Sequence, residues 1–228
     1  FDSYAKLLQL PQFSWAGSTV VSLEVTIATT LICIVVGALA AYPLARLDVP
    51  GKGLVTAAIV VTQTVPSIVV AIPTLLIFRW VGLADTVIGL IIAETAFLLP
   101  LVVWLLKSVF EGVPRALESA ARIDGCSRLG ALFRITMPAA WPGVAAIIIL
   151  ALIAIWNEFT FAVILGSKNT VTLTRLIGFI DGPAGAQGPP PFTVLAAAGI
   201  IAIAPCLVLV ILFHRRVVAG ITEGIVKG

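Results

Sequence analysis

Residues 114–138 read PRALESAARIDGCSRLGALFRITMP, a charged and helix-forming stretch in a chain that is otherwise strongly apolar. Of the 228 residues, 60% are hydrophobic and 11% are charged, and the mean hydropathy is +1.15. Soluble domains carry roughly 25% charged residues, so this composition indicates an integral membrane protein. A hydrophilic stretch inside such a chain predicts a surface that works in water.

Long apolar segments surround this stretch, each with about the 20 residues that a helix needs to cross a bilayer. They are residues 16–44, 54–78, 86–106, 139–165 and 193–213. We therefore predict an all-α, polytopic helical bundle that forms a single transmembrane domain over residues 1–228.

The distribution of Lys and Arg predicts the orientation, because basic residues accumulate in cytoplasmic loops. With the N-terminus outside, ten of the 14 basic residues share one side: Arg46, Lys52, Lys107, Arg115, Arg122, Arg128, Arg134, Arg215, Arg216 and Lys227. The other side has Lys6, Arg79, Lys168 and Arg175. We therefore expect residues 107–138 to be cytoplasmic and residues 166–192 to form an outer loop. The net charge of +3 reflects this topology, and nucleic acid is not an expected partner.

The chain lacks the sequence signs of catalysis or of a metal site. It has three cysteines without a CxxC spacing and a single histidine, so we expect neither a disulfide nor a bound metal. No phosphate-binding loop pattern is present. We therefore predict a non-catalytic subunit that holds no cofactor of its own.

The local pattern of residues 114–138 predicts two short helices joined by a turn. Pro114 suits a first helical position, residues 115–123 favour a helix, and Asp124-Gly125 favours a turn. Ser127 can cap a second helix, on which Leu129, Leu132 and Phe133 share one face. A solvated loop without a partner is the alternative, but the small side chains of Ala116, Ala120 and Ala121 favour close approach by another surface.

This stretch resembles the EAA loop of binding-protein-dependent ABC importer permeases. Ala120, Ala121, Gly125, Ile135 and Pro138 occur at the spacing of that pattern. Two positions differ: Ser119 stands where the pattern has Glu, directly after Glu118, and Met137 replaces Leu.

The resemblance extends nearly end to end and is closest to carbohydrate permeases of the maltose-transporter G type. The residues that show this resemblance are Ala40-Ala41-Tyr42, Ala45-Arg46, Thr62-Gln63 before Pro66, Gly82-Leu83-Ala84-Asp85-Thr86, Arg122-Ile123-Asp124-Gly125, Trp156-Asn157-Glu158-Phe159 and residues 218–228. The resemblance implies a type I ABC importer permease fold with six helices, of which the first would precede Phe1.

The same resemblance implies the partners and the location. A second homologous permease completes the pathway, two ATPase subunits bind ATP and Mg, and an extracytoplasmic binding protein delivers a sugar or sugar derivative. The expected location is the inner membrane of a bacterium or archaeon. The residues that it implies for ATPase coupling are Glu118, Ser119, Ala120, Ala121, Asp124, Gly125, Ile135 and Pro138.

Polar residues inside the apolar segments are candidates for the substrate pathway. Asn157 and Glu158 follow Trp156, a combination of amide, carboxylate and aromatic groups that suits a sugar. Gln63, near Pro66, is a weaker candidate. The alternative is that these polar groups join helices without touching substrate.

A rival hypothesis is an ion-coupled secondary carrier, in which Glu24, Glu94 or Glu158 would bind the ion. We see no convincing internal repeat, which disfavours a carrier. The resemblance to maltose-type permeases also implies that the outer loop, which ends in the Gly- and Pro-rich residues 181–191, contacts the binding protein. The alternative is a flexible spacer.

Overall fold

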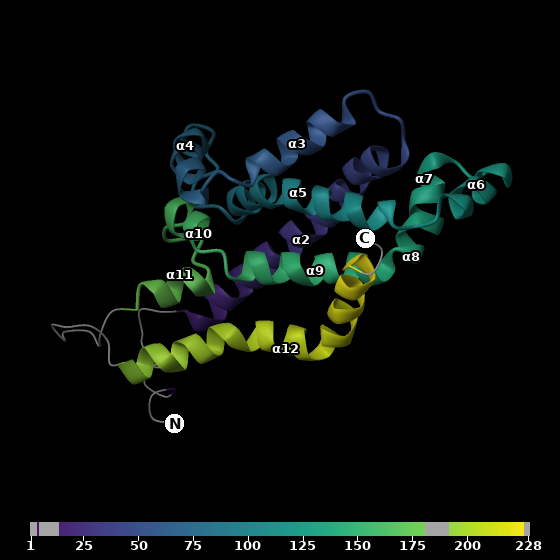
Figure 1. Ribbon diagram of the computed structural model, residues 1–228. Helices are drawn as coiled ribbons and strands as arrows, with labels where there is room; N and C mark the ends of the chain where they lie inside the picture. The colour runs from purple at the N-terminus through teal and green to yellow at the C-terminus, as the bar shows by residue number, and fades with distance from the viewer. Residues whose placement is uncertain (1–3, 5–13, 181–191, 226–228) are drawn as a thin grey trace. The chain divides into compact units, whose positions relative to one another are not determined.

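The computed structural model of the protein describes Tyr4 and residues 14–180 and 192–225 (Figure 1). Every regular element in these ranges is a helix. In chain order they are α2 (Trp15–Arg46), α3 (Lys52–Thr62), α4 (Ser67–Trp80), α5 (Val87–Glu111), α6 (Arg115–Ile123), α7 (Arg128–Ala131), the π-helical turn η1 (Leu132–Thr136), α8 (Met137–Ala139), α9 (Trp141–Trp156), α10 (Thr160–Leu165), α11 (Leu173–Gly178) and α12 (Phe192–Ile225). Residues 181–191 of the predicted outer loop lie outside the described residues.

The helices of spanning length differ in detail from the five uninterrupted spans predicted. Among the described residues, α2 and α5 are long and apolar enough to cross a membrane. Two further candidates are bent pairs: α3 with α4 at 91°, and Arg128–Ala139 with α9 at 84°. The apolar part of α12, Phe192–Val208, is a shorter helix. Long apolar segments were therefore located correctly, but two of them are broken.

The break between α3 and α4 has a local cause in residues 62–66. Pro66 has no N–H and disfavours a helical conformation at the residue before it. The hydroxyl groups of Thr62 and Thr64 donate to the carbonyl oxygens of Ile59 and Val61 at 2.6 and 2.8 Å. Hydroxyl groups that bond back to the helix compete with its continuation. Residues 54–78 therefore form two helices instead of one continuous helix.

A second break separates α9 from α10 at residues 157–159. The Asn157 amide donates to the Ile153 carbonyl at 2.8 Å, and the Glu158 carboxylate accepts from the backbone N–H groups of Phe161 and Ala162 at 3.0 and 3.2 Å. Glu158 therefore caps the start of α10, as polar side chains do where a helix begins. The predicted span 139–165 ends at this cap and restarts as α10.

The helices are distributed over two compact units. The first contains Phe1–Thr29, Ser67–Glu94 and Leu152–Ile211, and the second contains Thr30–Pro66, Thr95–Ala151 and Leu212–Gly228. In the first unit α10 packs against α4, and the Ser67 and Thr160 hydroxyls lie 3.3 Å apart. Its core joins Trp15 and Trp156 to apolar residues of α11 and α12: Leu173, Leu176, Val194, Ala197 and Ala198.

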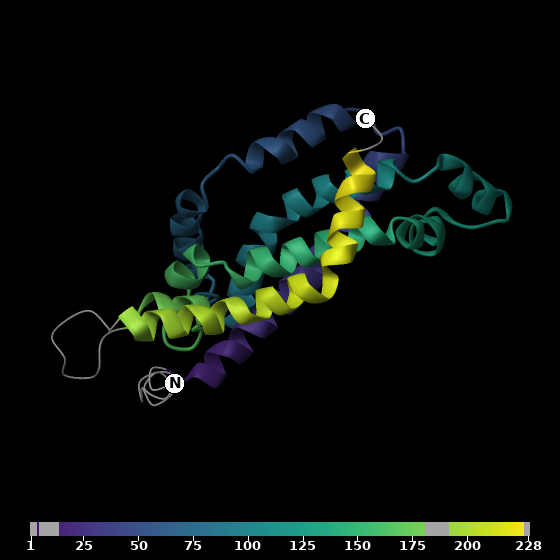
Figure 2. The ribbon, with the colours of Figure 1, turned by 60° about the horizontal axis from the view of Figure 1, so that its bottom comes forward.

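In the second unit, α9 approaches α5 through a residue without a side chain. A Cβ atom added to Gly143 would lie 2.6 Å from Cγ1 of Val109. Small residues at helix interfaces allow this close approach inside membranes. The second unit also carries α6 and α7, which extend beyond the end of α5 as two short helices (Figures 1 and 2).

Candidate functional site

The segment from Pro114 to Pro138 forms the predicted pair of helices. Helix α6 begins at Arg115, with Pro114 at its N-cap instead of its first turn. Gly125 has φ +85°, a left-handed conformation that glycine adopts readily. The Ser127 hydroxyl accepts from the Gly130 N–H at 3.1 Å, so the predicted cap is present. We call Pro114–Pro138 the hairpin.

The second arm of the hairpin differs from the single helix that the sequence predicted. Helix α7 ends at Ala131, and the π-helical turn η1 follows. Pro138 has no N–H to donate to the carbonyl of Arg134, so an ordinary α-helical bond cannot form there. Leu132 is buried, while Leu129 and Phe133 are 60% and 50% exposed. The predicted common face of Leu129, Leu132 and Phe133 is therefore wrong.

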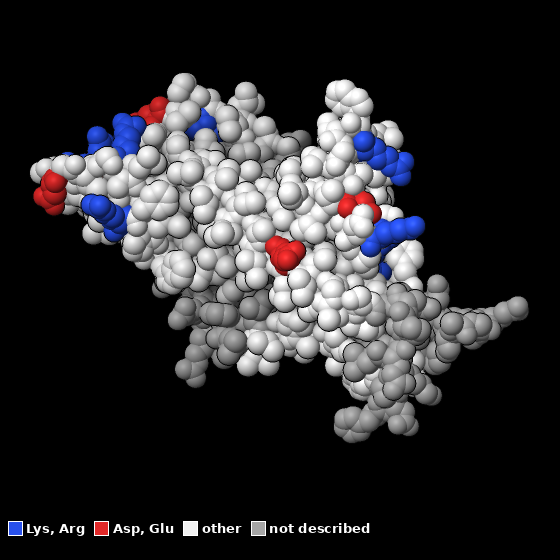
Figure 3. All heavy atoms as spheres, turned by 180° about the vertical axis from the view of Figure 1, so that it is seen from behind, with Lys and Arg blue, Asp and Glu red and all other residues white. Residues whose placement is uncertain are grey.

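The hairpin presents an apolar surface bordered by charges. Ile123 is 86% exposed and Leu117 is 48% exposed, in addition to Leu129 and Phe133. None of the residues of α6 is buried. Figure 3 shows Lys, Arg, Asp and Glu side chains gathered where the hairpin helices project. Large apolar side chains exposed in a charged, water-facing segment indicate a surface that a partner covers.

Glu118 connects the hairpin to the end of α2 in the second unit. Its carboxylate accepts a hydrogen bond from the Tyr42 hydroxyl and lies 3.4 Å from Nε of Arg46. Nη2 of Arg46 donates to the Val113 carbonyl at 2.6 Å. The Arg46 side chain is 3% exposed and that of Glu118 is 13% exposed. A spanning helix and the hairpin are thus joined by a largely buried ion pair, which we call the Glu118–Arg46 lock.

Ser119, the residue at the motif position for Glu, lies on another side of α6. It is exposed, and its hydroxyl donates to the Arg115 carbonyl at 3.1 Å. The remaining predicted coupling residues are mostly at the surface: Ala120, Asp124, Gly125 and Pro138 are exposed, and Ala121 and Ile135 are partly buried. Glu118 and Ser119 therefore face different surroundings although they are neighbours in sequence.

Three of the pathway candidates have hydrogen-bond partners in the first unit. The Trp156 side chain is buried, and its indole N–H donates to the Ala202 carbonyl at 2.9 Å. Glu158 caps α10, and its own carbonyl accepts from the Thr174 hydroxyl at 2.9 Å. Asn157 is exposed, with its amide nitrogen 3.5 Å from Sγ of Cys206. Of these three candidates, Asn157 is the one whose side chain remains accessible.

The fourth pathway candidate, Gln63, belongs to the second unit. It is partly buried at the C-terminal end of α3, and its amide nitrogen lies 3.5 Å from the Thr62 hydroxyl. The structure thus places Gln63 and Asn157 at two different helix breaks.

The acids of the rival carrier hypothesis differ in exposure and in hydrogen-bond partners. Glu24 is exposed on α2. Glu94 is 2% exposed, and its Oε2 has no hydrogen-bond partner among the described residues. Glu158 uses both carboxylate oxygens for the cap of α10.

Asp85, which belongs to the Gly82–Thr86 motif, organises a loop of the first unit. The Asp85 carboxylate accepts from the four consecutive backbone N–H groups of residues 167–170, over 2.7–3.2 Å. The Asn169 side chain adds a fifth donor group at 3.1 Å. Burial tends to raise the pKa of the Asp85 carboxyl, but the N–H donors outweigh it and hold the pKa below its ordinary value. Asp85 therefore holds residues 167–170 as a charged acceptor.

Known proteins are similar to this chain in sequence and in fold. Residues 12–223 match the family described as "binding-protein-dependent transport system inner membrane component". The chain belongs to this family. It is a permease subunit of an ABC importer, and its place is the inner membrane.

Two relatives of the permease are similar over most of both chains. The trehalose transport system permease protein SugB of Mycobacterium tuberculosis is 36% identical over all of this chain and 82% of that protein. The sulfoquinovosyl glycerol transport system permease protein SmoH of Agrobacterium fabrum is 36% identical over 91% of this chain and 72% of that protein.

A solved structure confirms the predicted fold of the permease. A bacterial ABC transporter involved in the import of the acidic polysaccharide alginate has a chain that superposes with a TM-score of 0.77 at 23% identity. The match covers 94% of this permease and 79% of that chain. Because the chain belongs to this family, the hypothesis of an ion-coupled carrier is no longer supported.

The sequence analysis of the permease missed the roles of Tyr42, Arg46 and Asp85. A signal for each was present. Arg46 ends an apolar segment with a charge, Tyr42 lies one helical turn earlier, and Asp85 follows Gly82-Leu83-Ala84 in a short loop. The pattern shows that these residues are unusual in their context, but their partners are 67–85 residues away in sequence and become visible only in the fold.

Proposed function

We propose that this permease subunit forms half of a translocation pathway for a sugar or a sugar derivative. The relatives support the substrate class, because SugB is named for trehalose and SmoH for sulfoquinovosyl glycerol. Both compounds present hydroxyl groups that amide and hydroxyl side chains can bind.

The other half of the pathway is a second homologous permease subunit. Two ATPase subunits bind ATP and Mg and supply the energy, and an extracytoplasmic binding protein supplies the substrate. This subunit does not itself hydrolyse ATP. It is the part of the transporter that moves within the membrane.

The Glu118–Arg46 lock is the observation that carries the coupling mechanism. The exposed apolar side chains of the hairpin dock on an ATPase subunit, with Ala120, Ala121 and Gly125 allowing close approach. When the ATPase subunits close, the hairpin moves with them as a rigid body. Because Glu118 is bound to Tyr42 and Arg46, the movement passes directly to α2, a single helix of 32 residues. ATP binding then shifts the balance between inward-open and outward-open states.

In the pathway we assign Asn157 to substrate contact, since its side chain is exposed at the break between α9 and α10. Gln63 has a similar position at the break between α3 and α4. Trp156 and Glu158 support this region through the packing and the helix cap described above.

The proposal is tested by purifying the full-length tagged protein from its native membranes in mild detergent. Mass spectrometry of the stoichiometric companions should identify an ATPase, a second permease and a binding protein. The complex in proteoliposomes should then take up a labelled sugar only with ATP and the binding protein. Isolation of this chain alone, with uptake driven by an ion gradient and indifferent to ATP, would refute the proposal.

A further inference from the structure

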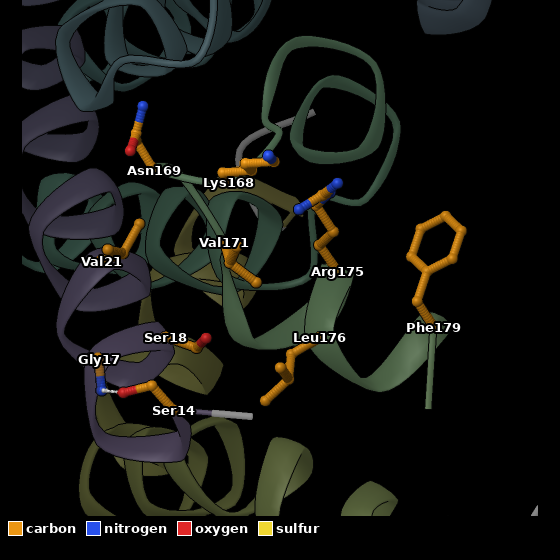
Figure 4. Close-up of a pocket in the computed structure, with 10 residues that line it drawn as sticks. All are labelled: Ser14, Gly17, Ser18, Val21, Lys168, Asn169, Val171, Arg175, Leu176 and Phe179. Carbon is orange, nitrogen blue, oxygen red and sulfur yellow. Dashed lines mark hydrogen bonds between the residues drawn. The ribbon is translucent and has the colours of Figure 1, made fainter. Parts of the chain in front are cut away.

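A pocket of about 410 Å³ opens in the first unit where α2 begins. On one side lie Ser14, Gly17 and Ser18, and on the other lie Lys168 and Arg175 (Figure 4). Pockets of about 300–1,000 Å³ hold small ligands or single side chains with their surroundings. All of the lining residues belong to this unit.

The pocket is cationic. Its lining includes Lys168 and Arg175 but no acidic side chain, and neither cation forms an ion pair within the described part of the chain. The first turn of α2 contributes the positive end of a helix dipole. The lining of the pocket therefore combines two cations, the start of a helix and two serine residues.

The Arg175 side chain is held in place by two contacts, and one of its nitrogen atoms makes no hydrogen bond to the described residues. Its Nη1 donates to the Ser167 carbonyl at 2.6 Å, and its guanidinium carbon lies 5.8 Å from the centre of the Phe179 ring. Its Nε is buried and has no hydrogen-bond partner among the residues that the structure describes. A guanidinium that is fixed in this way loses little conformational entropy when it binds a carboxylate.

Asp85 fixes the side of the pocket on which Lys168 lies. Both of its carboxylate oxygens accept from the N–H groups of residues 167–170. The backbone that carries Lys168 is thereby pinned at four successive positions. The site is preorganised, and preorganisation lowers the entropic cost of binding.

The place of these cations in the predicted topology indicates the kind of partner. Four basic residues fall on the predicted outer side, and two of them, Lys168 and Arg175, line this pocket. Unpaired cations on that side oppose the usual bias of basic residues toward the cytoplasm. A partner with an acidic surface would compensate them, and the binding protein is the partner that the family description names.

We propose that this pocket receives an acidic side chain of the binding protein when that protein docks on the outer face. The inference rests on the proposed function, and it assigns Lys168 and Arg175 as a docking site for a carboxylate. Attraction between the charges steers the binding protein toward the permease and orients it.

The test uses the complete transporter in nanodiscs and the binding protein that copurifies with it, loaded with its sugar. The measured quantity is the concentration of binding protein that gives half of the maximal stimulation of ATP hydrolysis. We expect Lys168→Gln and Arg175→Gln each to raise this concentration about fivefold, the upper range for an exposed pair. Arg175→Lys should retain most of the affinity. Arg79→Gln is the matched control, because Arg79 is exposed at the end of α4 and outside the pocket.

Salt provides the second measurement. Raising NaCl should weaken docking of the wild type more than docking of the double variant Lys168→Gln/Arg175→Gln, because salt screens charges beyond about 10 Å at 0.1 M. A double variant with the wild-type half-saturating concentration and the wild-type salt dependence would overturn the inference. So would an unchanged half-saturating concentration combined with a raised KM for the sugar, which would assign the pocket to substrate. If the wild type itself did not respond to the binding protein, the proposed function would be at fault instead.

Discussion

Glu118 shows how much depends on the orientation of a single side chain. It stands directly before the position at which the family pattern has Glu, and the two positions are about 100° apart around a helix. In the structure Glu118 turns to Tyr42 and Arg46, whereas Ser119 is exposed. The carboxylate of Glu118 therefore has its partners within the permease itself.

The Glu118–Arg46 lock leads to a prediction about coupling. Glu118→Gln removes the charge that compensates the buried Arg46, so the hairpin and α2 move together less well. We expect ATP-dependent uptake to fall about tenfold, within the range of mutations along a coupling network, while ATP hydrolysis continues. Uptake and hydrolysis measured in the same proteoliposomes give the ratio. Asp48→Asn is the control, because that carboxylate is fully exposed in its pair with Lys52. Equal ratios in the two variants would contradict the lock.

Asp85 gives a prediction about pH. Its folded pKa is lowered, so its contribution to stability is complete above the unfolded value of about 3.9 and is lost as pH falls through the folded pKa. Asp85→Asn should therefore lower the melting temperature of the purified complex at pH 7. The difference from wild type should shrink as the pH falls below about 4. A difference that stays constant from pH 7 to pH 3 would show that the charge is irrelevant.

At the scale of elements, the hairpin depends on the turn at Gly125. A side chain there must adopt φ +85°, which is strained for residues other than glycine. The space around Gly125 is open, so Gly125→Ala tests the strain alone and Gly125→Arg adds bulk at the proposed ATPase surface. We expect Gly125→Arg to abolish uptake with normal expression and assembly of the permease pair. Gly125→Ala should retain part of the uptake, and wild-type uptake by Gly125→Arg would argue against docking at this turn.

The packing of α9 on α5 allows a prediction about stability. Gly143→Val introduces atoms into space that Val109 occupies, since even a Cβ atom would lie 2.6 Å from it. Overpacking of this kind costs about 1–3 kcal/mol. Thermal unfolding of the purified complex should therefore begin at a lower temperature. Gly53→Ala in α3, where a Cβ atom meets nothing within 4 Å, should leave unfolding nearly unchanged; an equal loss in both variants would refute the packing argument.

At the scale of the whole molecule, uptake measurements can distinguish a residue that contacts substrate from one that only supports the structure. Asn157→Ala removes an exposed amide, so we expect a higher KM for the sugar with normal amounts of assembled complex. Glu158→Ala removes the cap of α10, worth about 0.5–2 kcal/mol, and should lower the yield or melting temperature of the complex as well as uptake. Uptake kinetics and size-exclusion yield, measured together, distinguish the two. Wild-type kinetics for Asn157→Ala would remove Asn157 from the pathway.

The whole molecule also shows how far the sequence alone could predict this permease. Composition and long apolar segments determined an all-helical membrane protein, and the spacing from Ala120 to Pro138 determined its family. The local turn and cap at Gly125 and Ser127 followed as well, because they depend on neighbouring residues. These features are repeated or local in the chain, so no knowledge of distant contacts was needed.

Only the tertiary structure decided which polar side chains find partners. The ion pair of Glu118 with Arg46, the clamp of Asp85 on residues 167–170 and the approach of Gly143 to Val109 each join segments that are far apart in sequence. The two helix breaks also depend on hydrogen bonds between backbone groups and the side chains of Thr62, Thr64, Asn157 and Glu158. Polar groups in an apolar protein must be satisfied somewhere, and the sequence states that requirement while only the fold determines the partner.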